Sequence, residues 1–171
     1  MNYIAVGIGE VLWDVFPNRR TIGGAPANFA YHTSQLGLDS YIVSAVGNDV
    51  LGDEAENVLK SKGLKSYILR TDYPTGAVTI SLNEYGVPKY DFQEQVAWDN
   101  IPFNEELVQL AKRTSIVCFG SLAQRNAKSR STIRQFLKAV PDTDKTFKVF
   151  DINLRQNFFL PLIHISEPTR P

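Results

Sequence analysis

Thr21-Ile22-Gly23-Gly24-Ala25-Pro26-Ala27-Asn28-Phe29-Ala30 leads from an extended segment into a helix. Its two glycines permit backbone angles and close approach that a side chain would prevent. Pro26 suits the first helical turn, where its missing N–H costs nothing. Asn28 falls in the same turn, beside backbone N–H groups that have no partner within the helix. Such a helix start favours a polar, hydroxyl-rich or anionic ligand, although a strand-to-helix turn that binds nothing has the same pattern.

Continuous apolar runs alternate with amphipathic segments on both sides of this loop. The runs are typical of strands buried on both faces, and we expect parallel strands near residues 3–9, 40–46, 65–70, 115–120 and 147–152. The segments between them predict helices over residues 26–36, 105–113 and 127–140, and another that ends near residue 62. The strand–helix alternation therefore predicts an α/β fold with a doubly wound, mostly parallel sheet.

The hydrophobic period changes to two over residues 75–83 and 89–95, which predicts an antiparallel hairpin. With the alternating excursion over residues 10–20, this hairpin is expected to form a small separate sheet that covers a site, although a surface hairpin without function has the same pattern. Asp14 could accept hydrogen bonds from two adjacent sugar hydroxyls, or could be a solvated turn acid. Phe92 and Tyr90 could stack on a sugar, or pack within the sheet.

Several spaced motifs occur in a fixed order along the chain: Gly23-Gly24-Ala25-Pro26-Ala27-Asn28, then Leu36-Gly37, Val46-Gly47-Asn48-Asp49 and Leu51-Gly52. This series resembles the N-terminal motif of the ribokinase-like (PfkB) carbohydrate kinases. Gly9-Glu10-Val11-Leu12-Trp13-Asp14 and Ala97-Trp98-Asp99 more narrowly resemble the fructokinases of that family. The resemblance extends from about Tyr3 to Leu160.

The resemblance implies a kinase that uses ATP and Mg²⁺ to phosphorylate a sugar hydroxyl, most like a fructokinase acting on D-fructose. Kinases for 2-keto-3-deoxygluconate or nucleosides are alternatives, as is a non-catalytic sugar-binding α/β module. The lid is expected over about residues 10–22 and 74–97, and the lid is also the expected homodimer contact. The expected substrate-binding residues are Asp14, Gly23, Gly24, Asn28, Phe92, Gln124 and Arg155.

Gln124 and Arg155 are included because each follows the carboxyl end of a predicted strand. Gln124 follows an apolar strand at its carboxyl end, where open α/β sheets bind ligands. Arg155 belongs to Asp151-x-Asn153-x-Arg155 at the end of the last strand, and its guanidinium could instead face the transferred phosphate. By resemblance, the catalytic base is an Asp in a Gly-Ala-Gly-Asp motif, and that motif does not occur in this sequence. We therefore expect residues 1–160 to be the N-terminal part of a kinase domain, inactive by itself, with no catalytic residue or metal ligand assigned within it.

Composition limits the other function classes. The 171 residues carry 18 basic and 18 acidic side chains, so the net charge gives no reason to expect a nucleic acid or an anionic membrane as partner. The single cysteine, Cys118, lies in an apolar run and is expected to be a core residue of a reducing compartment. No secretory signal or membrane-spanning run is apparent, and we expect a cytoplasmic protein.

The segment 161–171 departs from the pattern of the rest of the chain. It lacks a helical stripe, ends in Pro168-Thr169-Arg170-Pro171 and resembles a translated sequencing adapter. A short natural tail is the alternative. We expect the segment to be non-native, and His164 within it is not a candidate ligand.

Overall fold

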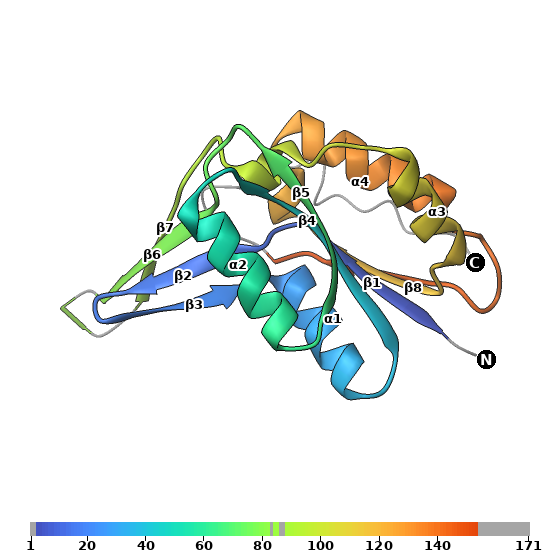
Figure 1. Ribbon diagram of the computed structural model, residues 1–171, viewed down its shortest axis with the longest axis horizontal. Coiled ribbons are helices and arrows are strands. Elements are labelled where there is room, and N and C mark those ends of the chain that lie inside the picture. Colours follow the sequence, from blue (N-terminus) through green and yellow to red (C-terminus); the bar gives the residue numbers. More distant parts are fainter. Residues whose placement is uncertain (1–2, 83, 86–87, 154–171) are drawn as a thin grey trace.

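The fold is built on a parallel sheet of five strands, which lies between two pairs of helices in Figure 1. The computed structural model describes residues 3–82, 84–85 and 88–153. The strands lie in the order β5 (Lys65–Thr71), β4 (Asp39–Gly47), β1 (Ile4–Ile8), β8 (Ile116–Gly120) and β9 (Phe147–Asp151). All four pairings are parallel. The predicted α/β class and the five predicted strands are therefore confirmed.

Four helices cover the two faces of this sheet. They are α1 (Ala25–Gln35), α2 (Val50–Ser61), α3 (Glu105–Arg113) and α4 (Ala127–Ala139). Helices α1 and α2 lie together on one face, and α3 and α4 lie together on the other (Figure 1). Side-chain amides start two of them, because Asn104 Oδ1 accepts from the Leu107 N–H and Asn126 Oδ1 accepts from the Lys128 N–H.

The hydrophobic core lies on both faces of the main sheet, between its strands and the helices that cover them. Strand residues such as Val6 and Val117 are fully buried against Leu110 of α3 and Phe136 of α4. On the opposite face, small residues of α1 such as Ala30 let the helix lie close to the sheet. A sheet buried on both faces explains why its strands have no alternating pattern in the sequence.

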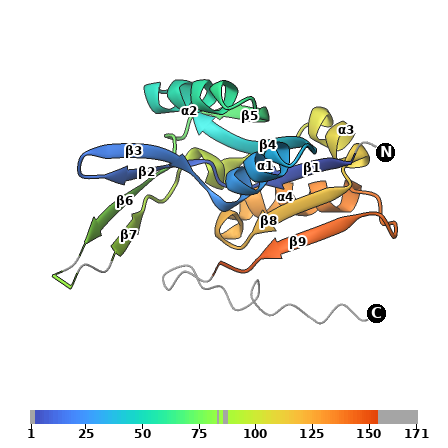
Figure 2. The same ribbon diagram turned by 90° about the horizontal axis from the view of Figure 1, so that it is seen from below.

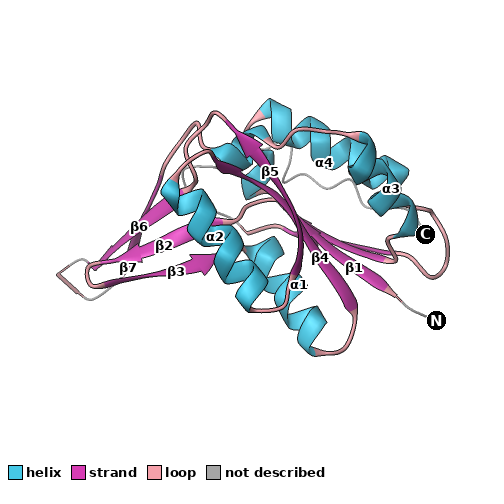
Figure 3. Cartoon of the chain, viewed as in Figure 1, coloured by secondary structure: helices cyan, strands magenta, loops and turns pink. Residues whose placement is uncertain are grey.

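A second sheet of four strands stands beside the first, at the left of Figure 3. It consists of β3 (Arg19–Gly23), β2 (Leu12–Phe16), β6 (Ala77–Leu82) and β7 (Pro88–Phe92), in that order. The hairpin β6–β7 is antiparallel as expected, and β2 forms a further antiparallel hairpin with β3. The pair that joins the two hairpins, β2–β6, is parallel. The small sheet is therefore mixed. Both hairpins leave the carboxyl edge of the main sheet, after β1 and after β5, so their first strands run in the same direction.

Specific contacts attach the small sheet to the main body, beside which it lies in Figure 2. The Trp13 indole Nε1 donates to the Leu51 carbonyl at 3.0 Å. Trp13, Val15 and Ala77 also pack with Val46 and Ala55 of the β4–α2 unit. The small sheet is thus fixed at its base, while strands β6 and β7 project away from the main sheet (Figure 2).

Across the residues that the structure describes, every helix is too short or too polar to cross a membrane.

Candidate functional site

A cavity of about 360 Å³ lies between the carboxyl edge of the main sheet and the small sheet. This edge is where open α/β sheets bind their ligands. The main sheet and α1 contribute Glu10, Gly24, Ala25, Asn28, Leu122, Asp151 and Asn153, and the small sheet contributes Leu12, Asp14, Phe16, Ile80, Tyr90 and Phe92. Segments that are far apart in the sequence thus form one binding surface.

Asp14 is placed on this surface by the period of β2. Leu12, Asp14 and Phe16 line the cavity, and the alternate residues Trp13 and Val15 pack toward α2. Gly23 is paired opposite Leu12 in β3, and a Cβ at Gly23 would clash with Asp14 Oδ2. Gly23 is therefore placed outside the lining, where it leaves room for the Asp14 carboxylate.

Gly24 precedes α1 with φ of 114°, in the region that favours glycine. A Cβ at Gly24 would also clash with the Glu10 carbonyl oxygen. The Glu10 side chain, only 1% exposed, accepts a hydrogen bond from the Ala25 N–H at 3.3 Å. Glu10 thus supplies an acceptor for one of the N–H groups that have no partner within the helix. Glu10 is not among the predicted site residues, and its place directly after an apolar strand is the signal in the sequence that could have identified it.

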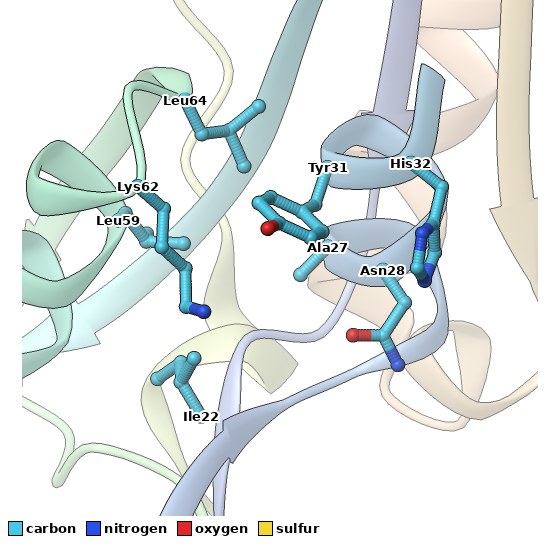
Figure 4. Close-up of a pocket in the computed structure, with 8 residues that line it drawn as sticks. All are labelled: Ile22, Ala27, Asn28, Tyr31, His32, Leu59, Lys62 and Leu64. Carbon is cyan, nitrogen blue, oxygen red and sulfur yellow. The ribbon is translucent and has the colours of Figure 1, made fainter. Parts of the chain in front are cut away.

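Asn28 lies on the first turns of α1 and lines the main cavity. It also lines a second, smaller pocket of about 190 Å³, shown in Figure 4. There, Asn28, Tyr31 and His32 of α1 lie opposite Lys62, whose Nζ is 5.0 Å from the centroid of the Tyr31 ring. Asn28 is thus the residue shared by the two pockets.

Two aromatic residues close the cavity on the side of β7. Tyr90 and Phe92 both line it, with ring centroids 6.5 Å apart and ring planes 30° apart. Their shared face agrees with the period of a strand. The lining of the cavity therefore combines aromatic rings with carboxylate and amide groups.

The structure does not bring the other two predicted site residues into this group. Gln124 belongs to a 3-10 turn (Leu122–Gln124), and its Nε2 donates to the Gly120 carbonyl at 2.9 Å. It is absent from the described lining residues, so its role in binding stays a prediction. Arg155 lies outside the described residues, as does the segment 161–171.

The end of β9 contributes Asp151 and Asn153 to the cavity, and neither is among the predicted substrate-binding residues. Asp151 Oδ1 accepts from the Asn153 N–H at 3.1 Å, and the Asp151 carbonyl accepts from the Ser121 N–H at 3.1 Å. The Ser121 hydroxyl also donates to the Ile152 carbonyl. These bonds fix the chain after β8 to the chain after β9 on the floor of the cavity.

Two acidic motifs of the sequence lie outside the cavity lining. Asp49 accepts from the Gly52 N–H at 2.7 Å, and from the Thr75 N–H and hydroxyl at 2.8 and 2.6 Å. Burial raises the pKa of Asp49, but these hydrogen bonds and the nearby Arg70 outweigh it and hold the pKa below its ordinary value of 3.8. Asp49 therefore caps α2 and holds the start of the β6–β7 hairpin.

Asp99 belongs to a second 3-10 turn (Ala97–Asn100) and forms a two-pronged ion pair with Arg125, at 2.7 and 2.8 Å. The two side chains are 3% and 9% exposed. The Arg125 guanidinium lies 4.2 Å from the centroid of the Trp98 ring and also donates to the Gln93 carbonyl, just beyond β7. The Ala97-Trp98-Asp99 motif thus joins the small sheet to the α4 side of the molecule.

Cys118 is buried in β8. Burial, with smaller contributions from Asp151 and Glu10, raises the pKa of its thiol to about 11. The thiol is therefore protonated near neutral pH and unsuited to be a nucleophile. Within the described ranges, there is no group of three or more His, Cys, Asp or Glu residues that could hold a metal ion.

Comparisons with known proteins agree with this geometry. The chain matches the family model described as "pfkB family carbohydrate kinase" over residues 7–158. A sugar kinase of Pyrococcus horikoshii is 31% identical over 157 residues, covering 91% of this chain and 49% of that protein. An ATP-dependent 6-phosphofructokinase of Thermoanaerobacterium thermosaccharolyticum is 30% identical, covering 77% of this chain and 44% of that protein.

A more distant relative bears on the fructokinase resemblance. The Arabidopsis thaliana protein named "Probable fructokinase-6, chloroplastic" is 26% identical, covering 91% of this chain and 41% of its own length. The crystal structure of the Pyrococcus sugar kinase superimposes with a TM-score of 0.81 at 28% identity, covering 91% of this chain and 54% of the other.

The chain thus spans about half the length of the curated relatives it matches. Its fold, its motifs and its cavity at the carboxyl edge of the sheet are all accounted for by one family. The chain belongs to the pfkB family of carbohydrate kinases.

Proposed function

We propose that the complete protein carrying this chain is an ATP-dependent kinase that transfers the γ-phosphate of ATP to a hydroxyl of D-fructose. One observation carries the proposal: a single cavity gathers the Asp14 carboxylate, the Asn28 amide and the Phe92 ring from three separate segments. The fructokinase names among the relatives support fructose as the sugar.

The residues of the cavity suit the recognition of a sugar. The Asp14 carboxylate can accept hydrogen bonds from adjacent hydroxyls, and the Asn28 amide can both donate and accept. The rings of Tyr90 and Phe92 present a flat apolar wall to the C–H groups of a sugar. Together these groups would orient the acceptor hydroxyl, and orientation is a large part of catalysis in phosphoryl transfer.

ATP would supply the phosphoryl group, with Mg²⁺ neutralising its charge. A solved structure of the Pyrococcus sugar kinase is a complex with ATP. The part of the chain that the structure describes offers no group of acids suited to Mg²⁺ and no residue that we assign as the base. We therefore assign no proton transfer to these residues, and propose that residues 1–171 alone do not phosphorylate sugars.

We also propose that the small sheet acts as the lid of this site and as the homodimer contact. It forms one wall of the cavity, which supports the first role. Its surface also carries a groove of about 540 Å³ lined by Phe16, Pro17, Ile80, Pro88 and Tyr90, with Asn18 and Arg19 at the edge. An exposed apolar groove of this kind is typical of interaction surfaces.

The proposal is tested by measuring ATP-dependent phosphorylation of D-fructose by the complete protein and by its Asp14→Ala variant. Each hydrogen bond to a neutral hydroxyl contributes about 1 kcal/mol, and more when a carboxylate accepts it. We expect kcat/KM for fructose to fall at least tenfold in the variant, which corresponds to about 1.4 kcal/mol.

Asp91→Ala is the matched control, because Asp91 is an exposed acid of the same small sheet that is not part of the described cavity lining. It should leave the kinetics unchanged. Unchanged sugar kinetics in Asp14→Ala would remove Asp14 from the site, and no phosphorylation of any sugar by the complete protein would refute the kinase proposal.

A further inference from the structure

We infer that Arg125 is a positioning residue for the sugar, because it sets where β7 presents Phe92 to the cavity. The inference rests on the proposed function and adds to it a residue outside the described lining. It starts from Gln93, which follows Phe92 at the end of β7 and whose carbonyl accepts a hydrogen bond from the Arg125 guanidinium. Phe92 itself lines the cavity.

The end of β7 has little support from the small sheet itself. Among the strands that the structure describes, β7 pairs with β6 alone, and Val78–Phe92 is the last pair of their register. A further bond, from the Gln93 N–H to the Ala77 carbonyl, is long at 3.4 Å. Beyond it the chain turns at Gln95, whose φ of 57° lies in the left-handed region. The position of Phe92 therefore depends on what holds the chain just after it.

Arg125 can provide this support because its own position is fixed. Its Nε and Nη2 groups donate to the two carboxylate oxygens of Asp99, and its guanidinium lies on the ring of Trp98. Asp99 and Trp98 are both buried. Nη2 carries two N–H groups, so it can donate to Asp99 and to the Gln93 carbonyl at once. Because a bidentate pair fixes the plane of a guanidinium, the direction of the bond to Gln93 is set as well.

Arg125 is also attached to a second part of the cavity lining. It directly follows the 3-10 turn Leu122–Gln124, and its N–H donates to the Leu122 carbonyl at 3.2 Å. Leu122 lines the cavity, as Phe92 does. One residue thus connects the lining segment that follows β8 with the strand end that carries Phe92, and fixes the separation of these two segments.

The start of the β6–β7 hairpin is held by different contacts. The Ala97 N–H donates to the Pro74 carbonyl at 2.8 Å. A Cβ at Gly76 would lie 2.2 Å from the Trp98 Nε1, so the backbone there packs directly on the indole. Loss of the bond at the other end would therefore leave the hairpin attached and release only the end of β7.

Arg125→Lys tests the inference in the complete protein. Lysine keeps a positive charge for Asp99, but a single ammonium lacks the planar fork that reaches a carboxylate and a carbonyl together. We expect KM for D-fructose to rise about fivefold through weaker contact with the Phe92 ring. Because that contact binds the sugar equally in the ground state and the transition state, kcat and KM for ATP should change by less than about twofold.

Arg70→Lys is the matched control. The Arg70 guanidinium also binds two carboxylates, those of Asp53 and Glu56. It donates as well to a backbone carbonyl, that of Gly47, and Arg70 is outside the described cavity lining. The control should leave KM for fructose unchanged. An equal rise of this KM in both variants, or a parallel rise of KM for fructose and for ATP in Arg125→Lys, would show a merely structural role and overturn the inference.

A double-mutant cycle identifies the residue through which Arg125 acts. Phe92→Ala should itself raise KM for fructose, because it removes the ring. Arg125→Lys should then raise KM no further in the Phe92→Ala background, since the group that Arg125 positions is gone. An equal rise in the presence and absence of the Phe92 ring would overturn the inference.

Hydrogen exchange tests the position of β7 without any reaction. In Arg125→Lys, the protected amides within residues 89–93 should exchange roughly tenfold faster than in the parent, whereas those of β4 and α1 should exchange at the same rate. Unchanged exchange over residues 89–93, or faster exchange along the whole chain, overturns the inference. If the complete protein phosphorylates no sugar, the kinase proposal fails, and this measurement alone decides whether Arg125 positions the end of β7.

Discussion

The acids of the cavity, Glu10, Asp14 and Asp151, differ from the acids of the framework, Asp49 and Asp99, in the groups that surround them. Asp49 and Asp99 have both of their carboxylate oxygens hydrogen-bonded to named groups of the protein. The cavity acids line a space large enough for a small ligand, and Glu10 and Asp151 also accept from the Ala25 and Asn153 N–H groups. Glu10, Asp14, Asp49 and Asp99 all lie in motifs that resemble those of carbohydrate kinases. The resemblance of a motif therefore identifies the fold, whereas the surroundings of its carboxylate indicate whether it stabilises the protein or faces a ligand.

Among the variants of these acids, we expect Asp99→Ala to cause the largest loss in the free energy of unfolding. It leaves the buried Arg125 guanidinium without its carboxylate, and breaking a buried ion pair in this way costs about 3–5 kcal/mol. Urea unfolding of the complete protein measures the loss. The double variant Asp99→Ala/Arg125→Met should recover part of the stability, because no charge is then left buried. A variant as stable as the parent would show that this pair does not support the framework.

Asp49→Ala should have the next largest effect. The change removes the cap of α2 and leaves the Thr75 N–H without its acceptor, so we expect the free energy of unfolding to fall by about 1–3 kcal/mol. Asn104→Ala is the matched control, because it removes a cap alone and should cost about 1 kcal/mol. Equal losses in the two variants would mean that the bonds to Thr75 add nothing.

Because of Asp49, we also expect the free energy of unfolding to depend on pH. The pKa of Asp49 is lower in the folded protein than its ordinary value of 3.8. Its contribution to stability is therefore complete above about pH 4 and is lost as the pH falls through the lower folded value. The difference in unfolding free energy between the parent and Asp49→Asn should narrow on acidification below pH 4. A difference that stays constant with pH would show that the charge of Asp49 does not contribute to the free energy of unfolding.

The smallest effect should come from Asn28→Ala. Asn28 is an exposed residue, so the free energy of unfolding should change by less than about 0.5 kcal/mol. Loss of one hydrogen bond to a sugar hydroxyl, about 1 kcal/mol, should raise KM for fructose about fivefold. Asn57→Ala, at an exposed position of α2, is the control for both measurements. A large loss of stability in Asn28→Ala would show that Asn28 stabilises the fold, as Asp49 and Asp99 are expected to do.

Most of the fold was predictable because it depends on local patterns. The apolar runs of β4 and β8 have no alternation, as required of strands covered on both faces, and the structure confirms them. Asn104 precedes α3 at the position where a capping amide is expected, and the helix has the predicted bounds. The parallel pairing of β2 with β6 has no such local pattern, since it depends on where two distant hairpins leave the main sheet.

The site was predictable only in part for the same reason. Asp14, Asn28 and Phe92 lie in motifs or on a strand face that can be read from the sequence, and the structure brings them together. Glu10 and Asp151 reach the cavity because two strands end at the same edge, which a single sequence shows only as two unrelated acids. The Asp99–Arg125 pair joins residues 26 positions apart, beyond the reach of helix or strand periodicity.

The position of β1 between β4 and β8 has a consequence for synthesis on the ribosome. β1 ends at Ile8, but its second neighbour is complete only at Gly120. At about 5–20 residues per second, the ribosome needs roughly 6 to 22 seconds to produce the intervening chain. During that interval β1 can pair on one side only, with β4. The first strand made is thus among the last to be enclosed, and the nascent chain presents an apolar strand edge to chaperones until β8 emerges.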